Sequence, residues 1–188
     1  MKRRDEGKAR DILAATLQEI EATGLAGLAM EAVARRAGVA TGTVYIYFKG
    51  KEALLDALYA QCKRDFGAML APEPGLPVRA GFSRVCTGIL TYLIEHRAEV
   101  SFLFQMTGSP DLTEETRSVS ASSSRAILEV LERGKREKVL KDLDTSLMRA
   151  FLQGALRDLA EVAAREPPAR RAAAFEQITT LCWDALKA

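Results

Sequence analysis

The segment from Thr41 to Phe48 contains the side chains best suited to contact another molecule. On a helical wheel at about 100° per residue, its residues separate into two arcs. The inner arc consists of Val44, Tyr47 and Phe48. The outer arc consists of Thr41, Gly42, Tyr45 and Ile46. The hydroxyl groups of Thr41 and Tyr45 can form hydrogen bonds with base edges, and apolar side chains can contact thymine methyl groups. If this helix binds DNA, the outer arc is the face that would enter the groove.

The residues before this helix explain how it is positioned. Residues 31–51 read EAVARRAGVATGTVYIYFKGK and begin with a short helix whose apolar stripe is Met30, Val33, Ala34 and Ala37. Gly38 then supplies the backbone freedom that a tight turn between steeply crossed helices requires, and Val39 fills the turn. Two short helices joined by a glycine turn form a helix-turn-helix, which indicates a DNA-binding protein.

The stretch AGVATGTVYIYFKGKEALL resembles the signature of the TetR-type (TetR/AcrR) transcriptional regulators. The resemblance covers only the first quarter of the chain. It implies that Thr41, Gly42 and Tyr45 approach base edges in the major groove, and that Thr43, Tyr47 and Lys51 hold phosphates. The alternative is that Tyr45 and Tyr47 serve only to pack the motif.

Two residues depart from the family pattern. Ala29 stands where relatives place Ser or Thr to cap the first helix of the motif, so a capping hydrogen bond typically worth about 1 kcal/mol is absent. Glu31 stands where relatives often carry Arg; its carboxylate suits the positive end of the helix dipole but repels phosphate. The second helix is therefore expected to carry most of the DNA contact.

Composition favours an all-α protein and offers little for catalysis. With 188 residues, 48% of them hydrophobic, the chain is long enough for one or two cores. His96 is the only histidine, and the sequence contains no nucleophile elbow, phosphate-binding loop or dinucleotide fingerprint. Cys62, Cys86 and Cys182 fit neither a metal site nor a disulfide framework. We expect no enzyme activity, cofactor or metal, and reduced thiols in a cytoplasmic protein without membrane spans.

The charge is uneven although the net charge is only +2. Residues 1–51 contain nine Lys or Arg against six Asp or Glu, whereas the remainder carries a small acidic excess. Lys2, Arg3 and Arg4, followed by Lys8 and Arg10, form a basic N-terminal arm that either contacts phosphates or is a solvated helix start.

Periodicity and breakers predict about nine helices in two domains. Residues 1–50 form the three-helix DNA-binding domain, and residues 51–188 form a helical effector-binding and dimerisation domain. Helices are expected at 5–23, 51–70, 78–95, 98–106, 112–138, 144–166 and 168–186, besides the two of the motif. The first stops at Gly24, and Asp144 caps the helix that follows it. The serines within 118–124 are expected to permit close helix packing.

The last two predicted helices have wide apolar stripes that need covering. The resemblance implies that they pair with their copies in a four-helix dimer interface, and the alternative is an ordinary intrachain core. The residues predicted for the interface are Leu152, Gly154, Ala155, Leu159, Phe175, Ile178 and Cys182. A dimer suits DNA binding because two reading heads about 34 to 36 Å apart reach successive major grooves.

The middle of the chain is rich in apolar, aromatic and sulfur side chains, and the resemblance implies an effector pocket there. The predicted lining is Phe66, Met69, Phe82, Cys86, Leu90, Phe102, Phe104, Met106 and Phe151. The sequence thus predicts a homodimeric repressor of a palindromic operator on double-stranded DNA, released by a small apolar effector. The alternative is a helical ligand-binding or protein-interaction module whose DNA-binding head is weakened, and activation in place of repression also remains open.

Overall fold

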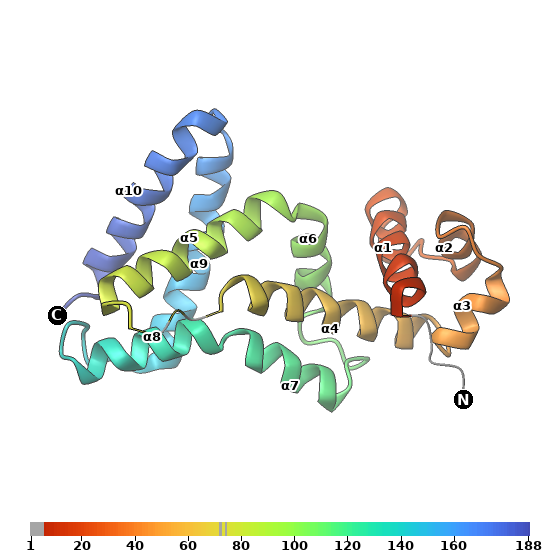
Figure 1. The fold of residues 1–188 in the computed structure, drawn as a ribbon, viewed down its shortest axis with the longest axis horizontal. Helices are drawn as coiled ribbons and strands as arrows, with labels where there is room; N and C mark the ends of the chain where they lie inside the picture. Colours follow the sequence, from red (N-terminus) through yellow and green to blue (C-terminus); the bar gives the residue numbers. More distant parts are fainter. Residues whose placement is uncertain (1–5, 72, 74) are drawn as a thin grey trace. The chain divides into compact units, whose positions relative to one another are not determined.

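The computed structural model describes residues 6–71, 73 and 75–188, so Lys2, Arg3 and Arg4 of the predicted basic arm lie outside the described residues. The described chain forms ten helices, and one antiparallel bridge joins Leu140 to Lys187. The helices are α1 (Glu6–Thr23), α2 (Met30–Arg36), α3 (Thr41–Tyr47), α4 (Lys51–Met69), α5 (Val78–Glu95), α6 (Arg97–Met106), α7 (Glu114–Ser123), α8 (Arg125–Arg136), α9 (Thr145–Ala164) and α10 (Pro168–Leu186) (Figure 1). The predicted all-helical class is confirmed.

The chain divides into two compact units. Unit 1 comprises the residues up to Arg64 together with Ala98–Ser120, and unit 2 comprises Asp65–Arg97 together with Ala121–Ala188. The division falls inside α4 and inside α7, so each of these helices contributes residues to both units.

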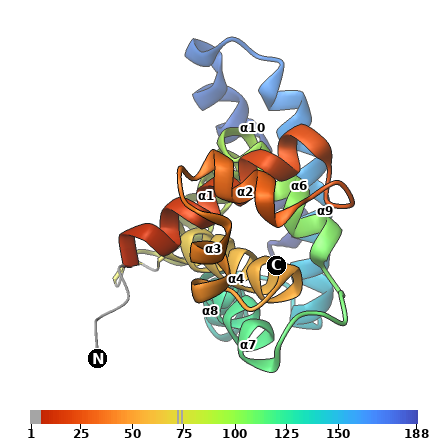
Figure 2. The same ribbon diagram turned by 90° about the vertical axis from the view of Figure 1, so that its right-hand side faces the viewer.

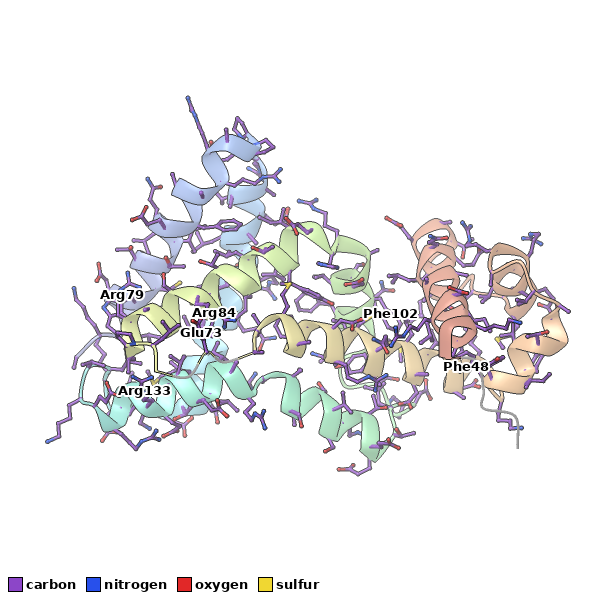
Figure 3. All side chains as sticks on the ribbon, in the orientation of Figure 1. Phe48, Glu73, Arg79, Arg84, Phe102 and Arg133 are labelled. Atoms are coloured by element: carbon purple, nitrogen blue, oxygen red, sulfur yellow. The ribbon has the colours of Figure 1, made fainter. Side chains whose placement is uncertain are left out.

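Unit 1 holds the helix-turn-helix against α1. Gly24 ends α1, as the sequence predicts, by adopting a φ of +75°, and its N–H donates to the Ile20 carbonyl at 2.8 Å. Asp56 of α4 accepts hydrogen bonds from the Thr113 backbone N–H at 2.8 Å and from its hydroxyl, which fixes the segment entering α7 to α4. Figure 3 labels Phe48 and Phe102, two of the buried aromatic side chains of this unit.

Unit 2 is built around α5, which packs against α8, α9 and α10. Its buried core includes Phe82, Leu90, Leu131 and Leu152. The Phe82 ring meets Trp183 edge to face, with ring centroids 5.3 Å apart. Burial of these large side chains is the main term that holds the four helices together.

Two arginines fasten the connection between α4 and α5 to the rest of unit 2 (Figure 3). Arg84 donates to the Ala71 carbonyl and lies 3.6 Å from the Glu73 carboxylate. Arg133 of α8 donates to the Leu76 carbonyl at 2.6 Å. Main-chain carbonyls that no helix satisfies are thereby paired with guanidinium donors.

The helix predicted across 112–138 was wrong as a single element, because the chain interrupts it at Ser124. There the Ser124 N–H donates to the Ala121 carbonyl at 3.2 Å, a tighter turn than an α-helix makes. Serine hydroxyls compete for backbone hydrogen bonds, which weakens a helix at such a run. The expected close packing is present nonetheless: a Cβ atom added to Gly67 would lie 3.1 Å from the Ser123 Cα.

The start of α9 and the end of α10 are fastened by hydrogen bonds. The Asp144 carboxylate accepts from the Leu147 N–H at 3.0 Å, so the predicted N-cap is confirmed. The Lys141 N–H donates to the Leu186 carbonyl at 2.9 Å, which ties the end of α10 to the α8–α9 connection. Within the described part of the chain, every helix is too short or too polar to cross a membrane.

Candidate nucleic-acid interface

The helix-turn-helix consists of α2, a glycine turn and α3. Each helix has only seven residues, and α2 buries Met30, Val33 and Ala34. Gly38 adopts a φ of +67°, a backbone conformation that disfavours residues with a Cβ atom, and the Val39 N–H closes the turn on the Ala34 carbonyl at 3.0 Å. The turn therefore separates α2 and α3 as two short helices (Figure 2).

The faces of α3 agree with the predicted arcs. Val44 is fully buried and Phe48 is buried just after the helix, whereas Tyr47 is half-buried with its ring centroid 6.4 Å from that of Phe48. Tyr45 and Ile46 are 44% and 60% exposed. Large side chains this exposed on a short helix are available to a binding partner.

The other predicted DNA-contacting residues lie on α3 and at the start of α4. Gly42 is exposed, and a Cβ atom added there would meet no atom within 4 Å. Thr41 and Thr43 are half-buried in the first turn of α3, and Lys51 is half-buried at the first residue of α4. An ammonium group at a helix N-terminus, where backbone N–H groups are unpaired, favours an anion such as phosphate.

Three candidate contact residues were missing from the set predicted from the sequence. Ile46 lies on the exposed face of α3, and its apolar side chain suits contact with a thymine methyl group. Arg35 and Lys49 are exposed basic residues that flank the motif. The helical wheel places Ile46 on the outer arc, so this residue was detectable from the sequence. Arg35 and Lys49 were detectable as well, because they are basic residues within or next to the motif.

The two departures from the family pattern have the structural result expected of them. Ala29 makes no side-chain capping bond at the start of α2, and Glu31 is exposed in the first turn of that helix. Ala40 likewise leaves α3 without a side-chain cap. Neither short helix gains stability from capping, so both depend on packing for their position.

The residues predicted to line an effector pocket are distributed over both compact units. Phe82, Cys86 and Leu90 lie in the core of unit 2, and Phe66 packs against this core. Met69, also on α4, is half-buried. Phe102 and Met106 are buried in unit 1. The two remaining residues are exposed, Phe104 on α6 and Phe151 on α9.

The residues predicted for a dimer interface are also divided. Leu152, Ile178 and Cys182 are buried in the core of unit 2, with Ala155, Leu159 and Phe175 partly buried against it. Gly154 is half-buried with open space around its Cα. The large apolar side chains that α9 and α10 leave exposed are instead Leu147, Phe151, Val162 and Leu181.

The thiols offer no reactive nucleophile in unit 2. Burial raises the pKa of the Cys86 thiol above its ordinary value, the nearby Cys182 raises it further, and Arg79 acts in the opposite direction. Burial also raises the pKa of Cys182. Both thiols therefore stay protonated at neutral pH, and a protonated thiol is a poor nucleophile.

Comparison with known proteins agrees with this geometry. Residues 12–58 match the profile of the family described as bacterial regulatory proteins, tetR family. The HTH-type transcriptional regulator BetI 1 of Chromohalobacter salexigens is 39% identical over 62 residues, which span 33% of this chain and 31% of that protein. The Bacillus subtilis protein named uncharacterized HTH-type transcriptional regulator YhgD is 28% identical over 141 residues, 72% of this chain and 73% of that protein.

The fold likeness extends beyond the matched segment. A TetR family transcription regulator from Marinobacter aquaeolei superposes with a TM-score of 0.83 at 22% identity, covering 100% of this chain and 99% of that chain. The fatty acid degradation regulator FadR from Bacillus halodurans superposes with a TM-score of 0.72 at 21% identity over 96% of this chain and 97% of that chain. The sequence match to the TetR family lies in residues 12–58, which contain the helix-turn-helix. The likeness of fold to these regulators extends over the whole chain.

Substitution of Tyr45 and Lys51 should separate base readout from phosphate contact. Tyr45→Ala should cost about 1 to 3 kcal/mol of affinity for a selected operator, and less for random DNA, because a base contact is lost. Lys51→Ala should weaken both complexes alike and lower the slope of log affinity against log salt by about one. Fluorescence anisotropy across a salt series measures both effects. Unchanged operator affinity in a folded Tyr45→Ala protein would show that the reading face is misassigned.

Gly42→Ala should separate stability from DNA binding. The added methyl group has open space in the free protein, so the change should stabilise α3 by up to about 1 kcal/mol. It should weaken operator binding, because the methyl group occupies the space into which a base edge would approach. Gly81→Ala in α5 is the matched control, since its added Cβ makes only an ordinary contact of 3.4 Å with Val130. Urea unfolding and anisotropy measure the two effects, and tighter operator binding by Gly42→Ala would contradict close approach of the helix backbone.

Proposed function

We propose that this protein is a TetR-type transcriptional repressor that binds a palindromic operator as a homodimer and is released by a small apolar effector. Residues 1–50 would bind DNA, and residues 51–188 would bind the effector and dimerise. The observation that carries the proposal is the exposure of Tyr45 and Ile46 on the outer face of α3, opposite the buried Val44. A DNA-reading helix needs that division, because one face must be buried while the other enters the groove.

An operator search tests the DNA-binding step. The wild-type protein should select related duplexes from a randomised double-stranded library and bind the best of them more tightly than a scrambled duplex, with affinity falling as salt rises. A reporter carrying the selected duplex within a promoter distinguishes repression from activation. Absence of selective binding would favour the alternative, a helical ligand-binding or protein-interaction module with a weakened head, to which the uncapped α2 and the exposed Glu31 lend support.

The apolar surface of α9 and α10 supports the homodimer. Leu147, Phe151 and Val162 recur along α9 at spacings that keep them on one side of the helix, and Gly154 lies between them. Leu181 of α10 is 62% exposed. A surface of this kind on a chain that also carries a DNA-binding motif suits pairing with a second copy, which would supply the second reading head.

Leu181→Asp should shift the protein toward monomer. An exposed site tolerates aspartate in the free chain, whereas a carboxylate inside an apolar interface is costly. Gly154→Arg is a second variant with the same expected effect, because space is open around Gly154 within the chain. Ile46→Asp is the matched control: Ile46 is 60% exposed but lies on α3, so oligomeric state should not change. Multi-angle light scattering measures the mass, and a wild-type monomer at micromolar concentration would contradict the dimer.

The concentration of apolar, aromatic and sulfur side chains in unit 2 supports an apolar effector. Phe82, Cys86 and Leu90 lie in its core with Phe66 against them. Phe66 belongs to α4, the helix that begins at Lys51 beside the motif, so one continuous helix joins the candidate effector region to the candidate phosphate contact. The relative named as a fatty acid degradation regulator makes fatty acids a reasonable first class of probe.

An apolar effector should both stabilise the protein and weaken operator binding. Release depends on the difference in its affinity for the two conformations, so a tenfold loss of operator affinity requires about 1.4 kcal/mol of differential binding. Fatty acids, acyl thioesters and aromatic compounds should be screened by thermal unfolding and by anisotropy on the selected duplex. Compounds that raise the melting temperature without changing operator affinity would show ligand binding without induction.

A further inference from the structure

Glu19 is a charged residue buried near the end of α1. Only 7% of the residue is exposed, and its carboxylate Oε2 accepts hydrogen bonds from Arg36 Nε at 3.0 Å and from Arg36 Nη2 at 2.8 Å. Arg36 is the last residue of α2, and 38% of its side chain remains exposed. The ion pair therefore joins α1 to the end of the first helix of the motif.

A buried carboxylate needs this partner, because an unpaired charge away from water is strongly unfavourable. The pair also supplies something that apolar packing does not. Met30, Val33 and Ala34 bury one side of α2 and thereby set which face of the helix points inward. Because apolar contacts are non-directional, they tolerate small rotations about the helix axis. Two hydrogen bonds from one planar guanidinium to a fixed carboxylate restrict that rotation.

The position of α2 is passed on to the recognition helix. The α2 helix packs against α1 and against α3, and Arg36 is two residues before the Gly38 turn from which α3 departs. Since α2 and α3 have seven residues each and lack side-chain caps, neither has a rigid frame of its own. A rotation of α2 would therefore change the direction in which Tyr45 and Ile46 point.

We propose that Glu19 is a positioning residue for DNA recognition: through Arg36 it sets the orientation of α2 and thus the angle at which α3 meets the major groove. This inference rests on the proposed DNA-binding function. It assigns Arg36 to the protein's internal framework through its ion pair with Glu19, whereas the neighbouring exposed Arg35 is available to phosphate.

Glu19 could affect DNA binding through its charge alone or by positioning α2, and the two roles predict opposite changes in operator affinity for Glu19→Gln. Removing a carboxylate from the DNA-binding unit reduces repulsion of phosphate, so a simple charge effect would tighten binding to every duplex. Loss of positioning should instead weaken operator binding by roughly five- to tenfold, at the lower end of what loss of one base contact costs, with little change on a scrambled duplex. The sign of the effect on the operator therefore separates the two roles.

The variants are Glu19→Gln, Arg36→Lys, Arg36→Met and the double variant Glu19→Gln/Arg36→Met, with Arg35→Met as the matched control. Anisotropy across a salt series on the selected and scrambled duplexes provides the measurement, and urea unfolding confirms that each protein is folded. Arg36→Lys keeps the charge but loses the planar fork, so it should weaken operator binding without changing the salt slope and remains informative if Glu19→Gln does not fold. The double variant should cost no more than the worse single variant, because the two residues act through each other. Arg35→Met should lower the salt slope by about one.

The inference is overturned if Glu19→Gln binds the operator as tightly as wild type or more tightly, or if Arg36→Met lowers the salt slope by about one as a phosphate contact would. Additive losses in the double variant would also overturn it. These outcomes are distinct from failure of the proposed function, in which wild-type protein would not discriminate between the selected and scrambled duplexes at all.

Discussion

The marginal stability of seven-residue helices is the constraint on which the DNA-binding region depends. A helix that short is unstable alone in water, and neither α2 nor α3 has a side-chain cap to compensate. Both exist because Val33 and Val44, each fully buried, attach them to the rest of unit 1. The packing of the buried face of α3 therefore determines the orientation of its exposed face: the contacts of Val44 decide where Tyr45 points. Apolar burial provides most of the free energy, while Gly38 and the Glu19–Arg36 pair provide direction.

Unit 2 has a different organisation, in which the other helices pack around one long central helix. The α5 helix contacts α8, α9 and α10, and large side chains such as Phe82 and Leu90 fill the space between them. Its polar contacts are mostly peripheral: arginines hold the carbonyls of the α4–α5 connection, and Asp144 caps α9.

Most of the fold could be predicted from the sequence because its signals are local. Gly24, Gly38 and Asp144 act on their immediate neighbours, so helix ends were predicted within one or two residues at most positions. The break at Ser124 escaped prediction because the apolar pattern on both sides continues in helical register. The Glu19–Arg36 pair was invisible for another reason: it joins residues 17 positions apart, and nothing in the chain near either residue marks it as buried. Likewise, periodicity found the apolar faces of α9 and α10 but could not tell Leu152, which is buried, from Leu181, which is exposed.

The distribution of the three cysteines makes each unit separately observable. Cys62 lies in unit 1, Cys86 and Cys182 lie in unit 2, and the side chains of all three are buried. A thiol in a closed core is inaccessible to maleimides, so alkylation proceeds only through transient opening of the surrounding helices. The alkylation rate at each cysteine, followed by mass spectrometry, thus records how often that part of the molecule opens. The natural cysteines thus report on local unfolding, with Cys62 in one compact unit and Cys86 and Cys182 in the other.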